Sequence, residues 1–417
     1  MAITRRQFLT RAGGTLLGGL AMECGLGPDG ARGGELAKTA ATSGKDANVV
    51  TLFLSGDVMT GRGIDQILPH PGRPDLNEPY VRSALEYVAL AERASGPIAR
   101  PVDFAYIWGD ALTELDRVGP DARIVNLETS ITTSDDAWPR KGVHYRMHPA
   151  NVGCLTAAKL DCCVLANNHV LDYGRSGLAD TLATLRGTGI RTAGAGANAD
   201  EAARPAIIDV RPRSRVLVFS CAMETSGVPA EWAAQKGRPG VNVLEDLSPR
   251  SVDDLAREIA AYKLPGDIVV MSIHWGGNWG CQISSAERAF AHGLIDRAGV
   301  DVVHGHSSHH VKGIEVYHHK PILYGCGDLL DDYEGIGERE EYRADLALMY
   351  FPSFDAASGE LLRFAMTPTR IHRFRIGRAA GNDLAWLGSL LKREGAVLGT
   401  SVEAQADGRL LLHWDRL

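Results

Sequence analysis

A short apolar run near the middle of the chain ends in three polar residues, in the stretch DCCVLANNHVLDYG at residues 161–174. Residues 162–166 predict a buried strand, and Asn167, Asn168 and His169 follow it directly. A buried strand with an amide and an imidazole at its carboxyl end is how α/β proteins present metal ligands or acid and base groups to a cleft. We therefore take this strand end as the candidate active site.

Four other predicted strands end in the same kind of residue. The residues at their carboxyl ends are Asp57, Glu128, His274, and the pair His306 and His309. Carboxylates, imidazoles and one amide oxygen from different strands form the ligand set of a hydrolytic site with one or two metal ions. Each residue alone also has a structural explanation, such as a turn or a helix cap. Four histidines between positions 304 and 310 favour metal binding.

The predicted strands alternate with segments of helical spacing, at residues 177–186, 252–262 and 285–298. This alternation predicts an α/β domain of two or more layers. Further strands are predicted at residues 206–210, 216–221, 320–326, 346–351, 361–366 and 370–376. We assign residues 46–376 to the main domain and residues 377–417 to a small C-terminal appendage of one helix and strand.

The amino terminus carries Arg5 and Arg6, followed by Phe8 and Leu9 and a short apolar run rich in glycine. This pattern resembles a twin-arginine export signal, with an amphipathic helix as the alternative. We assign residues 1–45 to a signal and linker. The expected location is periplasmic, extracellular or in the cell envelope.

The net charge of the chain restricts the class of molecule that it can bind. The chain has a formal net charge of -7 and an isoelectric point near 6.1. A protein that binds nucleic acid without regard to sequence needs a basic face to displace counterions from phosphates. The expected partner is a small-molecule substrate or an anionic polymer, and no nucleic acid is expected.

Five motifs occur in order between about residues 50 and 335: GDVMTGRG, NLETSIT, ANNHVLDYG, HWGGNWG and GHSSHHVKGIEVYHHKPILYGCGD. They resemble the successive motifs of the CapA family, the capsule or poly-γ-glutamate synthesis proteins. The resemblance implies a fold similar to the calcineurin-type metallophosphoesterases, a four-layer αββα sandwich with a dinuclear metal centre between two sheets. It also implies two divalent ions of manganese, iron, zinc or calcium.

The resemblance implies a role for each candidate residue. Asp57 and His309 would bind the first metal, and Glu128 would bridge the two. Asn168, His274 and His306 would bind the second. His169 would be the acid that serves the leaving group, and Asp172 would orient it. The phosphoesterase pattern has a histidine where this chain has Met59, which predicts a first site that is weak, differently ligated or absent.

Two arginines are candidates for substrate binding. Arg62 follows the first motif, and Arg146 lies in the basic segment WPRKGVHYRMHP. A guanidinium matches carboxylate and phosphate alike, although a solvated loop is the alternative explanation of that segment. We predict that the acidic stretch at residues 328–341 is solvated surface.

The resemblance predicts a metal-dependent hydrolase or transferase that acts on the anionic polymer or its precursor, with peripheral association with a membrane synthesis complex. A phosphoesterase of small substrates and a peptide epimerase are alternative enzymes. A polymer-binding or export protein without catalysis is the alternative outside the enzymes. Loss of activity on chelation would separate the enzymes from the binding protein.

Overall fold

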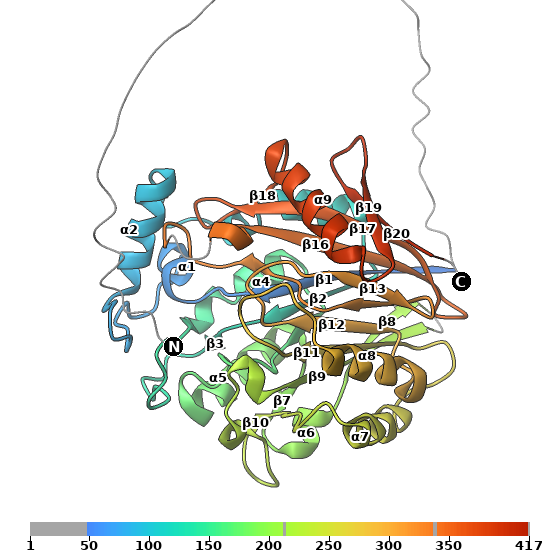
Figure 1. Ribbon diagram of the computed structural model, residues 1–417. Coiled ribbons are helices and arrows are strands. Elements are labelled where there is room, and N and C mark those ends of the chain that lie inside the picture. Colours follow the sequence, from blue (N-terminus) through green and yellow to red (C-terminus); the bar gives the residue numbers. More distant parts are fainter. Residues whose placement is uncertain (1–47, 212–213, 337–339, 416–417) are drawn as a thin grey trace, which may run out of the picture. The chain divides into compact units, whose positions relative to one another are not determined.

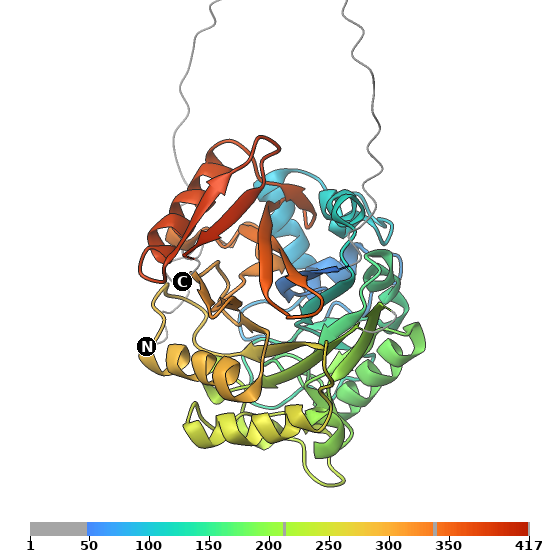
Figure 2. The same ribbon diagram turned by 90° about the vertical axis from the view of Figure 1, so that its right-hand side faces the viewer.

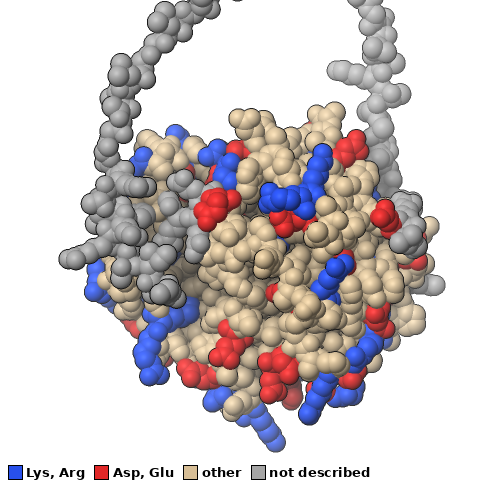
Figure 3. Space-filling model, in the orientation of Figure 1, with Lys and Arg blue, Asp and Glu red and all other residues tan. Residues whose placement is uncertain are grey.

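A computed structural model describes residues 48–211, 214–336 and 340–415. The predicted signal and linker at residues 1–45 lie outside the described residues. Among the described residues, none of the helices has both the length and the apolar content needed to cross a membrane. Basic and acidic side chains are interspersed on the face drawn in Figure 3.

Two mixed sheets form the centre of the molecule (Figure 1). The larger has the order β19-β20-β17-β16-β1-β2-β5-β6, with β15 paired to β1 and β18 paired to β17. Its strands are β1 Val49–Val58, β2 Ala122–Leu127, β5 Cys162–Val164, β6 Arg191–Ala193, β15 Asp328–Leu330, β16 Leu346–Asp355, β17 Leu361–Ile371, β18 Ile376–Arg378, β19 Thr400–Ala404 and β20 Leu410–Trp414. The order of the smaller is β13-β14-β12-β11-β9-β8. Its strands are β8 Ala206–Arg211, β9 Ser214–Ala222, β11 Ile268–His274, β12 Val302–His306, β13 Ile314–Tyr317 and β14 Lys320–Leu323. Two short pairs join β3 Ser130–Ile131 to β4 Arg146–Met147 and β7 Ala195–Gly196 to β10 Gly240–Val241.

Helices surround the sheets. They are α1 Arg62–Ile67, α2 Ala84–Ser95, α3 Asp110–Val118, α4 Gly153–Ala157, α5 Gly174–Thr188, α6 Ala199–Ala203, α7 Pro249–Ala260, α8 Ser285–Ala298 and α9 Asn382–Gly395. Short 3₁₀ helices lie at Tyr106–Trp108, Pro149–Asn151, Glu224–Ser226, Ala230–Trp232 and Glu340–Tyr342. The sequence encodes several helix ends: Ser284 and Glu287 form a capping box that begins α8, and Gly189 in the left-handed region ends α5.

Alternation along each strand divides the core between two faces. On β1, Leu52 and Leu54 point into the space between the sheets, while Phe53 packs against the helices outside. On β11, Val270 faces the same inter-sheet space and Val269 packs against α7 and α8. Both faces of each central strand are therefore covered, which explains the unbroken apolar runs in the sequence. Figures 1 and 2 show α7 and α8 below the six-stranded sheet.

The predicted strands at residues 361–366 and 370–376 are not two separate strands. Residues 361–366 and the first two residues of 370–376 belong to β17, which pairs with β16 from Leu346↔Arg370 to Phe354↔Leu361. The chain reverses only at Arg373 and Phe374, whose φ angles of 57° and 55° form the turn into β18. The α/β class is confirmed.

The C-terminal residues continue the larger sheet. β20 pairs with β17 through Ala365↔Leu411, and β19 pairs with β20 along its length. The α9 residues Leu387, Leu390 and Leu391 are buried in the inter-sheet core. The domain boundary at residue 376 stays a prediction.

Candidate metal centre

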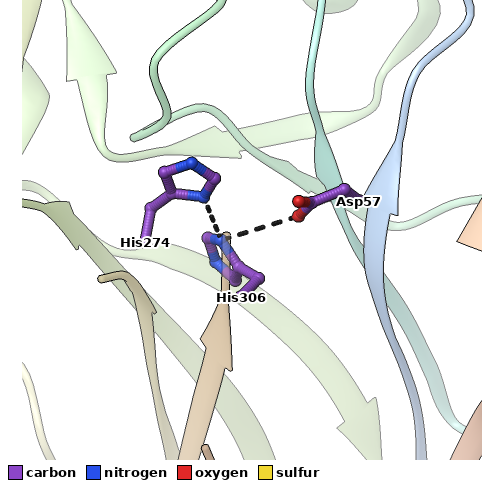
Figure 4. Close-up of side chains that lie close together, drawn as sticks. All are labelled: Asp57, His274 and His306. Carbon is purple, nitrogen blue, oxygen red and sulfur yellow. Dashed lines mark hydrogen bonds and ion pairs between the residues drawn. The ribbon is translucent and has the colours of Figure 1, made fainter. Parts of the chain in front are cut away.

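The candidate ligands come from strands of both sheets. Parallel pairing of β11 with β12 places His274 directly opposite His306, the last residues of their strands. Asp57 lies on β1 of the other sheet and is paired in register with Asn126 of β2. Figure 4 shows the side chains of Asp57, His274 and His306 directed toward one another. The carboxyl ends of parallel strands thus meet between the two sheets.

We call His274 and His306 the imidazole group. Their Nδ1 atoms are 2.7 Å apart, and His306 Nδ1 lies 3.9 Å from Asp57 Oδ1. The Nε2 atom of each histidine contacts a neighbouring polar side chain. His306 Nε2 contacts Ser272 Oγ at 2.8 Å, and His274 Nε2 lies 3.2 Å from Asn168 Oδ1. Such contacts orient an imidazole for metal binding. Asn168 therefore lies at His274, on the ring nitrogen that faces away from His306.

We call Asp57, Glu128, Asp328 and Asp331 the carboxylate group, and His309 lies against it. His309 Nδ1 lies 2.8 Å from Asp328 Oδ2, and its Nε2 contacts Asn278 Nδ2 at 2.9 Å. Ligand atoms of Asp57, His309 and Asp328 all lie within 4.8 Å of one another, as do those of Asp57, His274 and His306. Asp57 is thus common to both sets.

The carboxylate group concentrates negative charge in a buried space. Burial, and then repulsion from Asp328, raises the pKa of Asp57 to about 7. Burial and the neighbouring Asp57 raise the pKa of Glu128, and burial and Asp328 raise that of Asp331. Burial alone would lower the pKa of His309, but the carboxylates of Asp328, Asp57 and Asp331 together outweigh it and raise that pKa to about 9. The raised carboxyl pKa values show that nearby positive charge would stabilise the ionised carboxylates, and protonated His309 supplies one such charge.

The pKa values of the imidazole group shift in the opposite direction to those of the carboxyl groups. Burial, and then the positive charges of neighbouring histidines, lowers the pKa of His274 and of His306. Both rings are therefore neutral at ordinary pH, which is the protonation state that binds metal.

The environment of one carboxylate oxygen shows whether these residues fit a metal ion. Asp57 Oδ2 is buried and accepts no hydrogen bond from an N–H or hydroxyl donor among the described residues, and the Asp57 carboxyl lies beside that of Glu128. A buried carboxylate oxygen without such a donor is costly, and a cation would satisfy it. The mixed set of oxygen and nitrogen donors is suited to manganese, iron or zinc. The residues fit one or two divalent ions.

His169 lies beside the carboxylate group. Its Nδ1 is 2.6 Å from Asp172 Oδ2, and its Nε2 is 3.7 Å from Glu128 Oε1. The ring of Tyr145 stacks on that of His169 with centroids 3.7 Å apart. Nε2 is therefore the ring atom directed toward the candidate centre.

The two predicted substrate-binding arginines are engaged within the protein. Arg62 is 3% exposed and forms ion pairs with Glu78 and Asp332. Arg146 donates to the Ser134 carbonyl at 2.7 Å and to Asp135 at 2.9 Å. A substrate contact for either arginine stays a prediction.

The prediction that the acidic stretch is solvated surface was wrong for its first residues. Asp328, Asp331 and Asp332 are all buried. The reason is the parallel pairing of β15 with β1, in which Asp57 lies opposite Asp328. Asp328 follows an apolar run, as the predicted ligands do, and this signal could have identified it.

Two other contacts were missed by sequence reasoning. Asn126 Nδ2 donates to Asp57 Oδ1 at 2.7 Å, and Lys141 Nζ lies 2.6 Å from Asp172 Oδ1. Neither residue has a distinctive sequence pattern, since an asparagine within a strand and a lysine in a loop are ordinary.

Comparison with known proteins gives a family match and close relatives. Residues 51–333 match the family described as bacterial capsule synthesis protein PGA_cap. A Mycobacterium tuberculosis protein named "Probable polyglutamine synthesis accessory protein" is 51% identical over 364 residues, 87% of this chain and 96% of that protein. The "PGA biosynthesis protein CapA" of Bacillus subtilis is 26% identical over 327 residues, 78% of this chain and 72% of that protein.

Among solved structures, GAP50, the anchor in the inner membrane complex of Plasmodium, is 8% identical with a TM-score of 0.29. The match covers 82% of this chain and 95% of that one. Similarity at this level supports no argument about function.

Proposed function

The chain belongs to the bacterial capsule synthesis protein family PGA_cap, and from this we propose that it is an exported, metal-dependent hydrolase or transferase of capsule or poly-γ-glutamate synthesis. Its substrate would be the anionic polymer or a precursor. The family match and the names of the relatives support the biological setting, and the buried ligand sets support the chemistry.

The observation that carries this proposal is Asp57 Oδ2, which accepts no hydrogen bond from an N–H or hydroxyl donor among the described residues and lies among crowded buried carboxyl groups. Asp57, Glu128, Asp328 and Asp331 carry four negative charges when ionised, and two divalent ions would balance them. Asp57, His274 and His306 would hold one ion, with Asn168 beside His274. Asp57, His309 and Asp328 would hold the other, next to Glu128.

The finer assignment of the fold belongs to the same proposal. Two sheets that pack on each other, with helices on their outer faces, support a four-layer αββα sandwich of the metallophosphoesterase type. A candidate centre at the strand ends between the sheets is where that fold type carries its metals. The two arginines of the amino terminus support export, with peripheral association with a membrane synthesis complex.

Bound divalent ions would lower the pKa of a coordinated water and neutralise charge that develops on the substrate. The protein's own residues supply the proton transfer. Since Asp172 holds His169 Nδ1 at 2.6 Å, Nε2 is the atom that takes up a proton and delivers it to the leaving atom. Tyr145 stacks on the ring and keeps Nε2 directed toward Glu128.

The test begins with metal content, measured by elemental analysis of protein purified without chelator, beside His274→Ala. The proposal expects about two equivalents in the parent and fewer in the variant. Poly-γ-glutamate and an aryl phosphate are then supplied separately, before and after chelation and with a divalent ion restored. Chelator-sensitive change in polymer length supports the proposal. Turnover of the aryl phosphate alone supports a small-substrate phosphoesterase, and altered glutamate stereochemistry supports an epimerase.

A binding protein without catalysis is the second candidate, and Met59 favours it. Met59 is 2% exposed, and its thioether takes the place of a nitrogen ligand in the related phosphoesterase pattern. This candidate expects little metal, no turnover, and binding of poly-γ-glutamate that persists in chelator. No metal in either the parent or His274→Ala would overturn the metalloenzyme.

A further inference from the structure

Lys312 is a buried cation outside both candidate ligand sets. The residue is 5% exposed, and its aliphatic stem packs against Gly325. Its ammonium forms no hydrogen bond and no ion pair among the described residues. Arg62 and Arg123, the other buried basic residues of the described ranges, both have such partners. A buried ammonium without a partner is costly, and an anion beside it would remove this cost.

Glu287 is the carboxylate that acts most strongly on Lys312. Burial lowers the pKa of Lys312, and the charge of Glu287 is the strongest influence that opposes this fall. The two side chains form no ion pair. Glu287 Oε2 instead accepts a hydrogen bond from Ser284 N at 2.8 Å, in the capping box that begins α8. Glu287 Oε1 has no hydrogen-bond partner in the part of the chain that the structure describes.

An open space beside Gly276 separates these two charges. The φ angle of Gly276 is 72°, which favours glycine. A Cβ added there would lie 3.0 Å from Glu287 Oε1 and 3.9 Å from Lys312 Nζ, and it would meet no third described atom within 4 Å outside the adjacent residues. A Cβ added at Gly277 would meet nothing within 4 Å. The missing side chains leave room for a ligand to reach both charged atoms.

The glycine-rich loop at residues 276–280 also contacts the candidate centre. Asn278 Nδ2 lies 2.9 Å from His309 Nε2, and the ring centroid of Trp279 lies 5.5 Å from that of His309. Trp279 is partly exposed and stacks on His310 as well. A molecule bound beside Gly276 is therefore next to a candidate metal ligand, so one extended substrate can occupy both places.

We propose that Lys312 and Glu287 form a subsite for one γ-glutamyl unit of the substrate, with the free carboxylate of the unit on Lys312 Nζ and its amide N–H on Glu287 Oε1. In poly-γ-glutamate both groups are attached to the same carbon, so each unit offers an anionic acceptor and a donor side by side. The charge of Glu287 opposes a doubly charged phosphate more than a carboxylate. The identity of the polymer rests on the proposed function, and the subsite adds a determinant of specificity to it.

The test uses an N-acetylated γ-linked glutamate pentamer and the same pentamer with every carboxylate converted to an amide. Isothermal titration calorimetry measures the binding of both to the parent and to Lys312→Met, as purified and again in chelator, which prevents turnover. Lys312→Met should weaken binding of the acid pentamer roughly 10- to 100-fold, because it removes a charge-assisted hydrogen bond in a buried place. Binding of the amide pentamer should change less than about twofold.

Lys159→Met is the matched control, because it removes the same charge from a side chain that is 71% exposed. It should leave the affinity for the acid pentamer unchanged. Equal losses in Lys159→Met and Lys312→Met would show a general attraction between charges and overturn the subsite. If Lys312→Met fails to fold, the parent alone gives the answer, since equal affinity for the acid and amide pentamers overturns the inference.

An α-linked glutamate pentamer, acetylated at one end and amidated at the other, tests the part assigned to Glu287. Its carboxylates and amide N–H groups are attached to different carbons, so it should bind the parent at least roughly tenfold more weakly than the γ-linked acid pentamer. Equal affinity for the two pentamers would overturn the assignment of the amide N–H to Glu287 Oε1.

Kinetics separate this inference from the proposed function. If the γ-linked pentamer is turned over, Lys312→Met should raise KM roughly 10- to 100-fold with kcat changed less than about twofold. Carboxylate-dependent binding in a protein that turns over no polymer would support the subsite and count against the enzyme. Turnover with the same KM in the parent and Lys312→Met would overturn the subsite and leave the enzyme in place.

Discussion

The imidazole group and the carboxylate group meet at Asp57 but are stabilised differently. The rings of His274 and His306 are held by Asn168 and Ser272, and burial keeps them neutral. The carboxyl groups repel one another, and Asp57 Oδ2 accepts no hydrogen bond from an N–H or hydroxyl donor among the described residues. The protein alone supplies partners for the imidazole group, whereas the ionised carboxylate group would be stabilised by added cations.

This difference shows how the fold distributes the ligands. Register within the six-stranded sheet pairs His274 with His306, so that a single pair of strands forms the imidazole group. The carboxylates come from β1, β15 and the end of β2, and they are crowded because β15 pairs directly with β1. A metal ion would therefore stabilise the carboxylate group more than the imidazole group.

The largest expected effect follows replacement of the ligand common to both ligand sets. Asp57→Asn should lose both metal equivalents, because it removes a charge from each ligand set. Asp65→Asn is the matched control, since Asp65 is equally buried but accepts hydrogen bonds from Gly72, His148 and Asn151. Elemental analysis should show unchanged metal in the control. Full metal content in Asp57→Asn would mean that the ligand sets do not share this residue.

A single replacement in either group should remove one metal ion and leave the other bound. We expect His274→Ala and Asp328→Asn each to lose about one equivalent, because each leaves the other ligand set in place. The two variants are compared by elemental analysis at the same protein concentration. Loss of both ions from either variant would show that the two groups act as one cooperative site.

The metal-free protein should show opposite pH responses at Asp57 and at His304. The folded pKa of Asp57, about 7, is above its ordinary 3.8, so its contribution is present below about pH 4 and is lost as pH rises through 7. Burial lowers the pKa of His304, behind the imidazole group, to about 4, so its contribution is present above 6.5 and is lost as pH falls toward 4.

Urea unfolding of protein treated with chelator measures how the free energy of unfolding depends on pH. In the parent, ionisation of Asp57 should lower the free energy of unfolding by at most about 4 kcal/mol between pH 4 and 7, since one pKa unit corresponds to about 1.4 kcal/mol. Asp57→Asn should lack this decrease. His304→Gln should reduce the loss on the acid side. Identical pH profiles for the parent and Asp57→Asn would contradict the crowding of the carboxylate group.

The smallest expected effect comes from Asn126, which donates to Asp57 Oδ1 at 2.7 Å. Asn126→Ala should weaken metal affinity roughly 10- to 100-fold without removing a ligand, because groups behind a ligand fix its orientation. Competition with a chromogenic chelator measures the change. Asn151→Ala, which removes a buried asparagine that bonds Asp65, should leave affinity unchanged. An equal loss in both variants would indicate general destabilisation.

Much of the site was accessible from the sequence because strand ends have a local signature. Polar residues at the ends of apolar runs, and the histidine cluster at 304–310, identified Asp57, Glu128, Asn168, His274, His306 and His309, and the structure brings all six to one region. The same signature was present at Asp328, but the acidic stretch that follows it suggested solvent exposure. Burial of an acidic residue depends on its partners, which the sequence does not specify.

The sequence by itself determined the family, the alternation of strands and helices, and the residue types at the strand ends. These properties depend on neighbours a few positions apart, because side-chain direction repeats every two residues in a strand and every 3.6 in a helix. Tertiary structure alone decided the pairing of β15 with β1, the burial of Arg62 between Glu78 and Asp332, and the contact of Lys141 with Asp172. These contacts join residues that are distant in the chain or lie in irregular loops, so packing of the whole core selects them.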